Sequence, residues 1–320
     1  MKNIVISIII MLSLLSSVAC RQRTSEPVAE SGSHSAVLAP QKVRKFIPAI
    51  APSTLSPEQQ QAYMVEHYWD KFDFADTTFI AEVDTSHMAT AFAIYAAGYL
   101  PDSLAEQGMT RLMQRASVSR RMFDYFMMLA DAVLYNPNSP LRNYEKYIPV
   151  LRVAATTPLY DEYERMPYEH DLKMALQNRV GEQANDFVYT LGDGSTGKMS
   201  DIEAEYLLLF ISNPGCPMCR DIREQIIASP HMNELLERGT LKVLVIYPDE
   251  DLAAWREHLA DYPALWINAY DKGMVLTREE LYDLRAIPSL YLLDSSKKVM
   301  AKDCVDVEYI EHLILEADAL

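Results

Sequence analysis

The sequence feature that most constrains the fold is a pair of cysteines, Cys216 and Cys219, separated by two residues. The pair directly follows an apolar run, residues 207–211, and directly precedes a helical pattern. The chain is therefore expected to turn from a buried strand into a helix at the cysteines. The first sulfur then lies beside unpaired backbone N–H groups at the positive end of the helix dipole, where a thiolate is stabilised.

Two cysteines in this arrangement indicate redox chemistry. A thiolate attacks disulfides, and the second cysteine, one helical turn on, can close the ring and release the mixed disulfide. A structural disulfide usually closes a longer loop, because a longer loop removes more entropy from the unfolded chain. The rival interpretation is half of a zinc site, but the next histidine, His231, has no second partner at zinc-finger spacing, and the sequence contains no second C-x-x-C. We predict neither a metal nor a cofactor.

The first residues are typical of an export signal. Lys2 precedes an apolar stretch, residues 4–15, and small residues follow it up to Cys20. We expect a signal peptide over residues 1–19. A cysteine at the cleavage point resembles the lipobox of bacterial lipoproteins, which implies lipidation of Cys20 and a membrane anchor in the cell envelope, facing the periplasm. The alternative is plain secretion with cleavage near Ala19.

Composition narrows the classes of partner and fold. The net charge of −16 makes nucleic acid an unsuitable partner. A hydrophobic content of 49% over 320 residues is enough for two cores. Residues 20–56 are rich in Ser, Ala and Pro without a sustained period, and we expect a lipidated flexible tether there.

Apolar residues at spacings of three and four then predict an all-α domain over residues 57–178. Helices are expected at 57–72, 86–99, 101–115, 118–135 and 141–155. The Met- and aromatic-rich stretch at 125–129 favours core packing, with a peptide-binding groove as the alternative.

Strand and helix patterns alternate over residues 179–320 and predict a mixed α/β domain. The predicted strands lie within 181–191 and near 198–202, 205–212, 241–247, 265–269, 289–294 and 298–301, and the predicted helices at 218–237, 250–260, 277–284 and 306–318. The predicted fold class is thus α+β with two domains, a helical N-terminal domain followed by an α/β domain.

Two motifs in this second region resemble the thioredoxin fold. The C-x-x-C follows an early strand, and Ile287-Pro288-Ser289 opens the penultimate one. The stretch GEQANDFVYTLGDG, beginning at Gly181, resembles the entry of TlpA/ResA-type thiol-disulfide oxidoreductases and of alkyl hydroperoxide reductase relatives. Residues 57–178 resemble an uncharacterised helical domain that precedes thioredoxin-like domains in exported lipoproteins.

The resemblance implies roles for individual residues. Cys216 is the expected nucleophile and Cys219 the resolving thiol. Pro288 is expected in the cis form, with Ile287 and Pro217 in the loops that bind an extended substrate. The implied function is an envelope thiol-disulfide oxidoreductase acting on exported cysteine-containing proteins, with a membrane dithiol as electron donor or acceptor.

The chain also departs from thioredoxins. Gly215 stands where tryptophan is usual, and Pro217 resembles the more oxidising glutaredoxin and DsbA pattern, so the direction of electron flow is open. The strand before the cysteines lacks the buried carboxylate used for proton transfer. Asp221 and Glu224 are candidate substitutes, with mere helix-dipole partners as the alternative.

Cys304, outside the motif, is expected to be a buried free thiol, the alternative being an intermolecular or regulatory disulfide. The missing tryptophan and acid also leave a second function open: a non-enzymatic binding lipoprotein with a thioredoxin-like scaffold and a helical recognition domain.

Overall fold

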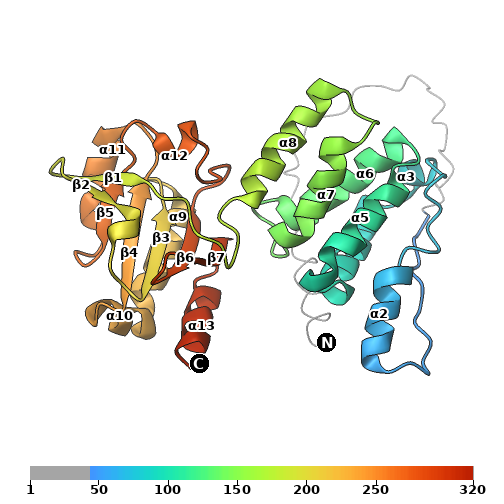
Figure 1. The fold of residues 1–320 in the computed structure, drawn as a ribbon, viewed down its shortest axis with the longest axis horizontal. Coiled ribbons are helices and arrows are strands. Elements are labelled where there is room, and N and C mark those ends of the chain that lie inside the picture. Colours follow the sequence, from blue (N-terminus) through green and yellow to red (C-terminus); the bar gives the residue numbers. More distant parts are fainter. Residues whose placement is uncertain (1–43, 320) are drawn as a thin grey trace, which may run out of the picture. The chain divides into compact units, whose positions relative to one another are not determined.

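The computed structural model describes residues 44–319. The chain folds into two compact units, the first ending at Tyr168 and the second beginning at Glu169. The first unit is helical and the second contains a mixed sheet, which confirms the predicted fold class (Figure 1). The expected signal peptide at 1–19 and the expected lipidation site, Cys20, lie outside the described residues.

The helices of the first unit begin at residues that cap them. Ser56 precedes α2 and its hydroxyl accepts the backbone N–H of Gln59, whose side chain in turn accepts the N–H of Ser56. The helices are α2 (Pro57–His67), α3 (Phe79–Glu82), α4 (Thr85–Ala93), α5 (Ala105–Ala116), α6 (Arg120–Ala130), α7 (Tyr144–Thr156) and α8 (Glu162–Leu176). Two π-helical turns, Ile94–Tyr99 and Asp131–Tyr135, continue α4 and α6. None of the helices within residues 44–319 combines the length and the apolar character that a membrane crossing requires.

An aromatic cluster around Trp69 forms the centre of the first unit. The Trp69 ring is buried, stacks on Phe46 with ring centres 4.9 Å apart, and meets Phe126 edge to face at 5.4 Å. Phe126 itself is fully buried, whereas Met128 points to solvent. The stretch at 125–129 therefore contributes to the core, as the core interpretation predicted.

Phe46 shows that the packed part of this unit begins before α2. Its ring is only 4% exposed, and the N–H of Ala49 donates to the carbonyl of Tyr68 at 3.2 Å. The flexible tether predicted for residues 20–56 is therefore wrong around Phe46, because a buried aromatic ring and a backbone hydrogen bond hold this stretch on the helices.

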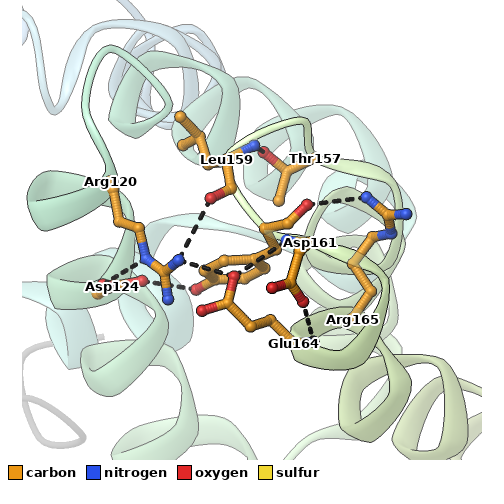
Figure 2. Close-up of polar contacts among 8 residues, drawn as sticks. Arg120, Asp124, Thr157, Leu159, Asp161, Glu164 and Arg165 are labelled. Atoms are coloured by element: carbon orange, nitrogen blue, oxygen red, sulfur yellow. Dashed lines mark hydrogen bonds and ion pairs between the residues drawn. The ribbon is translucent and has the colours of Figure 1, made fainter.

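A polar cluster joins α6 to the start of α8 (Figure 2). Arg120 pairs with Asp124 at 3.4 Å and with Glu164 at 2.8 Å, and its guanidinium lies 4.8 Å from the ring centre of Tyr160. The Tyr160 hydroxyl donates to Asp124 at 2.7 Å, and burial, followed by this hydrogen bond, raises the pKa of the phenol. Exposed ion pairs contribute little by themselves, so the part-buried hydroxyl–carboxylate bond is the stronger attachment of this corner.

The second unit is built on one mixed sheet. Its strands are β1 (Val188–Leu191), β2 (Thr196–Lys198), β3 (Tyr206–Ile211), β4 (Leu241–Tyr247), β5 (Ile267–Tyr270), β6 (Ser289–Asp294) and β7 (Val299–Cys304). Their spatial order is β2-β1-β5-β4-β3-β6-β7. The central strand β3 runs parallel to β4 and antiparallel to β6, and these three lie side by side in Figure 1.

Every residue of β3 is buried because both faces of the sheet are covered. Leu208 and Phe210 pack on one face with α9 (Pro217–Ala228), α10 (Pro230–Glu237) and α13 (Val307–Asp318). Leu207 and Leu209 pack on the other face, toward α12 (Val275–Arg278) and Tyr282. This three-layer arrangement fixes the end of β3, from which the cysteine loop emerges.

Three predicted elements differ from the structure. The helix predicted at 218–237 is two helices, because Pro230 cannot donate to the helical ladder and Ser229 caps α10 by accepting the N–H of Met232. Residues 199–201 form a 3₁₀ turn rather than a strand. α12 is short, because Glu280 adopts a left-handed conformation with φ of 52° that ends a helix.

Candidate functional site: a cysteine pair at a helix N-terminus

The topology of the sheet brings two distant loops together. β3 and β6 are antiparallel neighbours, with Ile211 opposite Ser289. The loop that follows β3 and the loop that precedes β6 therefore lie side by side, at the same end of these two strands. The Cys216 thiol donates to the carbonyl oxygen of Ile287 at 3.8 Å, and the Ile287–Pro288 peptide bond is cis.

Cys216 is the N-cap residue of α9. Its backbone is extended, and its Sγ accepts the backbone N–H of Cys219 at 3.3 Å. Pro217 occupies the first helical position, where a missing N–H costs no helical hydrogen bond. The Cys216 side chain is partly exposed. The arrangement places one sulfur at the positive end of the helix dipole and within reach of solvent.

Cys219 has the opposite surroundings. It is 2% exposed, and burial, followed by the hydrogen bond with Cys216, raises the pKa of its thiol to about 12. The backbone N–H of Asn213 and the hydroxyl of Ser212 act in the other direction, because they hydrogen bond to the sulfur and favour the thiolate, but burial outweighs them. The second thiol is therefore held protonated in the resting dithiol.

Gly215 accounts for the missing tryptophan. Its φ is +74°, in the left-handed region that side-chain-bearing residues rarely adopt. The loop thus reaches the cysteines by a turn that a tryptophan would strain. Pro217 and Met218, on the other side of Cys216, are exposed, Met218 at 49%. The rim beside the partly exposed sulfur is therefore apolar.

A hollow of about 200 Å³ opens beside the cysteines. Tyr262 lines it, and its hydroxyl lies 2.8 Å from that of Ser212, which is itself buried. The guanidinium of Arg223 lies 5.2 Å from the ring centre of Tyr262 and 3.4 Å from the Asp261 carboxylate. Burial raises the pKa of Tyr262, while Ser212 and Arg223 lower it. The hollow is lined by Asn213, Pro214, Gly215, Cys216, Pro217, Cys219, Arg220, Arg223, His258, Asp261 and Tyr262.

The proposed proton-transfer acids lie elsewhere. Asp221 and Glu224 are on the exposed side of α9, with side chains 60% and 64% accessible, and both face Arg220 at 3.7 and 3.9 Å. Neither lines the hollow. Their observed contacts fit the alternative of surface charges near a helix N-terminus.

Cys304 does not line the hollow that the pair lines. It ends β7, opposite Leu290, and is partly exposed rather than buried as predicted, because β7 gives way there to the loop before α13. The N–H of Asp306 donates to its sulfur at 3.4 Å. Within residues 44–319, no group of three or more His, Cys, Asp or Glu side chains is arranged to hold a metal ion.

Sequence reasoning missed Ser212, Arg223 and Tyr262. Ser212 could have been noticed as the polar residue that follows a fully apolar strand. Tyr262 carries no local signal, because only the tertiary fold brings it to the end of β3.

Comparisons with known proteins cover both units. A family model described as a domain of unknown function (DUF5106) matches residues 19–178. The crystal structure of a thioredoxin-like protein from Bacteroides caccae is similar at 39% identity and a TM-score of 0.80, covering 85% of this chain and 99% of that one. The C-terminal domain of an uncharacterized protein from Bacteroides fragilis is 46% identical over 43% of this chain and 98% of its own, with a TM-score of 0.42.

A curated relative matches a smaller part. Probable nucleoredoxin 1 from Arabidopsis thaliana is 24% identical over 132 residues, which are 41% of this chain and 22% of that protein. The chain thus spans about a fifth of the length of this relative. Taken with the cysteine loop and the sheet order, the family model and the Bacteroides caccae structure identify the chain as a member of the DUF5106 family whose second unit is a thioredoxin-like domain.

Proposed function

We propose that this protein is a thiol-disulfide oxidoreductase of the cell envelope that reduces or exchanges disulfides in exported proteins. The observation that carries the proposal is the contrast between the two sulfurs of one motif. Cys216 is partly exposed and caps α9, whereas Cys219 is buried one helical turn away, with its N–H on the first sulfur. A nucleophile and a resolving thiol require this division of accessibility.

The proposed cycle moves two electrons. The Cys216 thiolate attacks one sulfur of a substrate disulfide, forms a mixed disulfide and releases the other substrate sulfur as a thiolate. The Cys219 thiolate then attacks the Cys216 sulfur, closes the Cys216–Cys219 disulfide and releases the second substrate thiolate. A membrane dithiol restores the reduced pair, or a membrane disulfide accepts its electrons when the cycle runs in reverse.

The loops around Cys216 support a strand-like mode of substrate binding. Ile287 presents its carbonyl within 3.8 Å of Sγ, directly before the cis Pro288. An extended segment of a substrate can pair with exposed backbone groups at such a position, which gives affinity without demanding one sequence. Pro217 and Met218 add an exposed apolar rim. We infer that substrates present a disulfide flanked by an extended, partly apolar segment.

The proposal also covers where the protein acts in the cell. The leader-like residues 1–19 and the cysteine that follows them support export and lipidation at Cys20, with the protein anchored to a membrane and facing the periplasm. Disulfides form and persist in this compartment, so an exchange activity finds its substrates there.

The proposal is tested with two single substitutions. Cys216→Ser is expected to abolish reduction of insulin by dithiothreitol above the uncatalysed rate, because the attacking sulfur is gone. Cys219→Ser is expected to retain the first attack and to accumulate a covalent complex with a substrate protein, since nothing resolves it. The complex is detected on non-reducing gels and by mass spectrometry.

Cys304→Ser serves as the matched control, since it removes the remaining described thiol without touching the pair. If both Cys216→Ser and Cys219→Ser keep the full rate of insulin reduction, the proposal is wrong, and a purely binding role for the thioredoxin-like domain replaces it.

A further inference from the structure

The buried thiol of Cys219 poses a chemical problem that the proposed function does not solve. Cys219 must lose its proton before it can attack the mixed disulfide, yet it is 2% exposed. The strand behind it offers only apolar side chains, Leu208, Leu209 and Phe210. Asp221 and Glu224 face solvent on α9. The remaining acceptors are water in the hollow, which Cys219 lines, and the hydroxyl groups beside it.

Two hydroxyl groups form a continuous path from this sulfur to the hollow. Cys219 and Tyr262 line the same hollow, and the Ser212 hydroxyl, which favours the thiolate of Cys219, lies 2.8 Å from the hydroxyl of Tyr262. Ser212 is 1% exposed, so its hydroxyl is shut off from bulk water. Tyr262 lines the hollow and is partly exposed. Each hydroxyl can donate one proton and accept another, which is the requirement for a relay.

We propose that Ser212 and Tyr262 relay the proton of Cys219 to water in the hollow when the mixed disulfide is resolved. This inference rests on the proposed function. In this relay Ser212 exchanges the proton with the reacting sulfur and is the catalytic residue, whereas Tyr262 acts through Ser212 and is a positioning residue.

The step balances in atoms and electrons. The Cys219 proton passes to the Ser212 oxygen as the Ser212 proton passes to Tyr262 and the Tyr262 proton passes to a water molecule. The Cys219 thiolate then forms a bond to the Cys216 sulfur, the bond from that sulfur to the substrate breaks, and the substrate leaves as a thiolate. No outside oxidant or reductant is needed within the step.

The charges around Tyr262 suit this role. Burial, the largest cause, raises the pKa of Tyr262, and Asp261 raises it further. Arg223, which lies over the ring and pairs with Asp261, acts against them and favours the transient loss of the phenolic proton. The charged and titratable groups that line the hollow with Tyr262 come from α9 and from the segment before Tyr262, and are Cys216, Cys219, Arg220, Arg223, His258 and Asp261.

Ellman's reagent separates the two attacks in one experiment. The full chain with Cys20 and Cys304 replaced by serine is reduced and mixed with the reagent. Cys216 releases a first thionitrobenzoate and forms a mixed disulfide, and Cys219 releases the second. For Tyr262→Phe we expect an unchanged first phase and a second phase slowed about tenfold or more near neutral pH.

The pH profile distinguishes a relay from loosened packing. Because hydroxide removes the thiol proton directly, the second phase of Tyr262→Phe should approach that of the parent as pH rises from about 9 toward the raised pKa of the Cys219 thiol, and its solvent deuterium isotope effect should differ from the parent's. Ser212→Ala should behave like Tyr262→Phe. Tyr270→Phe, which alters another partly buried tyrosine packed on a tryptophan, should leave both phases unchanged.

The outcomes separate the two proposals. A second phase that Tyr262→Phe and Ser212→Ala leave unchanged at every pH overturns the relay and assigns the proton to water in the hollow. A slowing that persists equally at all pH values also overturns it, because misplaced sulfurs are then the cause. If the parent shows no second phase that depends on Cys219, the proposed function itself fails.

Discussion

A short motif gives its two identical side chains unequal chemistry because one caps a helix and the other lies beneath it. The Cys216 sulfur takes a place in the N-cap that serine or aspartate usually fills, so a backbone N–H points at it. Cys219, at the third helical position, belongs to the same buried core cluster as Phe210 and Ile222. The helix thus sorts the sulfurs into an accessible one and a protected one.

Burial of Cys219 predicts a pH dependence of stability in the reduced protein. The pKa of its thiol is raised from 9.0 to about 12 in the fold. Between these values the unfolded chain has lost a proton that the folded chain keeps, so the stabilising contribution is complete below about pH 9 and is lost as pH rises toward 12. The reduced protein should therefore lose stability in this range.

The measurement compares urea unfolding of the reduced parent and of Cys219→Ala at several pH values on either side of the ordinary thiol pKa of 9.0. The substitution lowers stability at neutral pH by leaving a small cavity, but it should flatten the alkaline fall. Equal slopes for the two proteins in the alkaline range would show that Cys219 does not titrate as its burial requires.

The residues of the site differed in how far sequence could reveal them. Cys216 and Pro288 were found because each lies in a short pattern next to a recognisable strand. Ser212 and Tyr262 were not, because their roles depend on a hydroxyl pair that forms only when the 3₁₀ turn Leu259–Asp261 is placed beside the end of β3. Local sequence patterns therefore predict the residues that react better than they predict the residues that support them through tertiary contacts.

At the scale of elements, α5 depends on one close approach. Gly108 is buried on α5, and a Cβ atom at this position would lie 2.6 Å from Leu100 Cδ1 and 2.8 Å from the Tyr95 hydroxyl. The Tyr95 hydroxyl is tied to the carbonyl of Val65, so it cannot move away freely. Gly108→Ala should therefore destabilise α5 by about 1–2 kcal/mol despite the better helix propensity of alanine. Amide hydrogen exchange in α5 measures the change.

Gly98→Ala provides the matched control. Gly98 is exposed in the turn Ile94–Tyr99, and a Cβ atom there would meet Ile94 at 3.9 Å, an ordinary contact. In Gly98→Ala, amide hydrogen exchange in the segment Ile94–Tyr99 should slow or stay the same. Equal effects of the two alanines would mean that propensity, not packing, decides stability on these helices.

The strands of the second unit were predicted better than its helices for a physical reason. β4 and β6 match their predicted limits, because strands buried on both faces have nearly continuous apolar sequences. The helix breaks depended on single residues. Pro230 divides α9 from α10. The left-handed backbone of Glu280 prevents α12 from continuing, and no sequence pattern predicts that conformation.

At the scale of the whole molecule, the division into units falls within one helix. α8 contains Pro167, which cannot donate a hydrogen bond to the preceding turn, and the division follows the next residue, Tyr168. The rest of α8 belongs to the second unit. The sequence pattern changes only near Asn178, so it placed the boundary at the end of the helix rather than at its proline.

Lys302 ties the end of α8 to the rest of the thioredoxin-like unit. The ammonium group of Lys302 donates to the carbonyls of Met174, Ala175 and Gln177 at 3.3, 2.8 and 2.5 Å. The last carbonyls of a helix have no intrahelical donor, and a cation there also complements the helix dipole. A fragment of residues 162–320 keeps these bonds, whereas one of residues 179–320 loses them together with the burial of Ala175.

We therefore expect the shorter fragment to unfold at lower urea concentration, by about 1–3 kcal/mol, since Lys302 loses three acceptors at a partly buried site. Lys302→Met in the longer fragment should remove most of the difference while keeping the apolar stem of the side chain. If the two fragments unfold together, the end of α8 contributes nothing to the second unit. If Lys302→Met is neutral while the fragments differ, burial of Met174 and Ala175 holds the helix end instead, because apolar contacts then outweigh the carbonyl bonds.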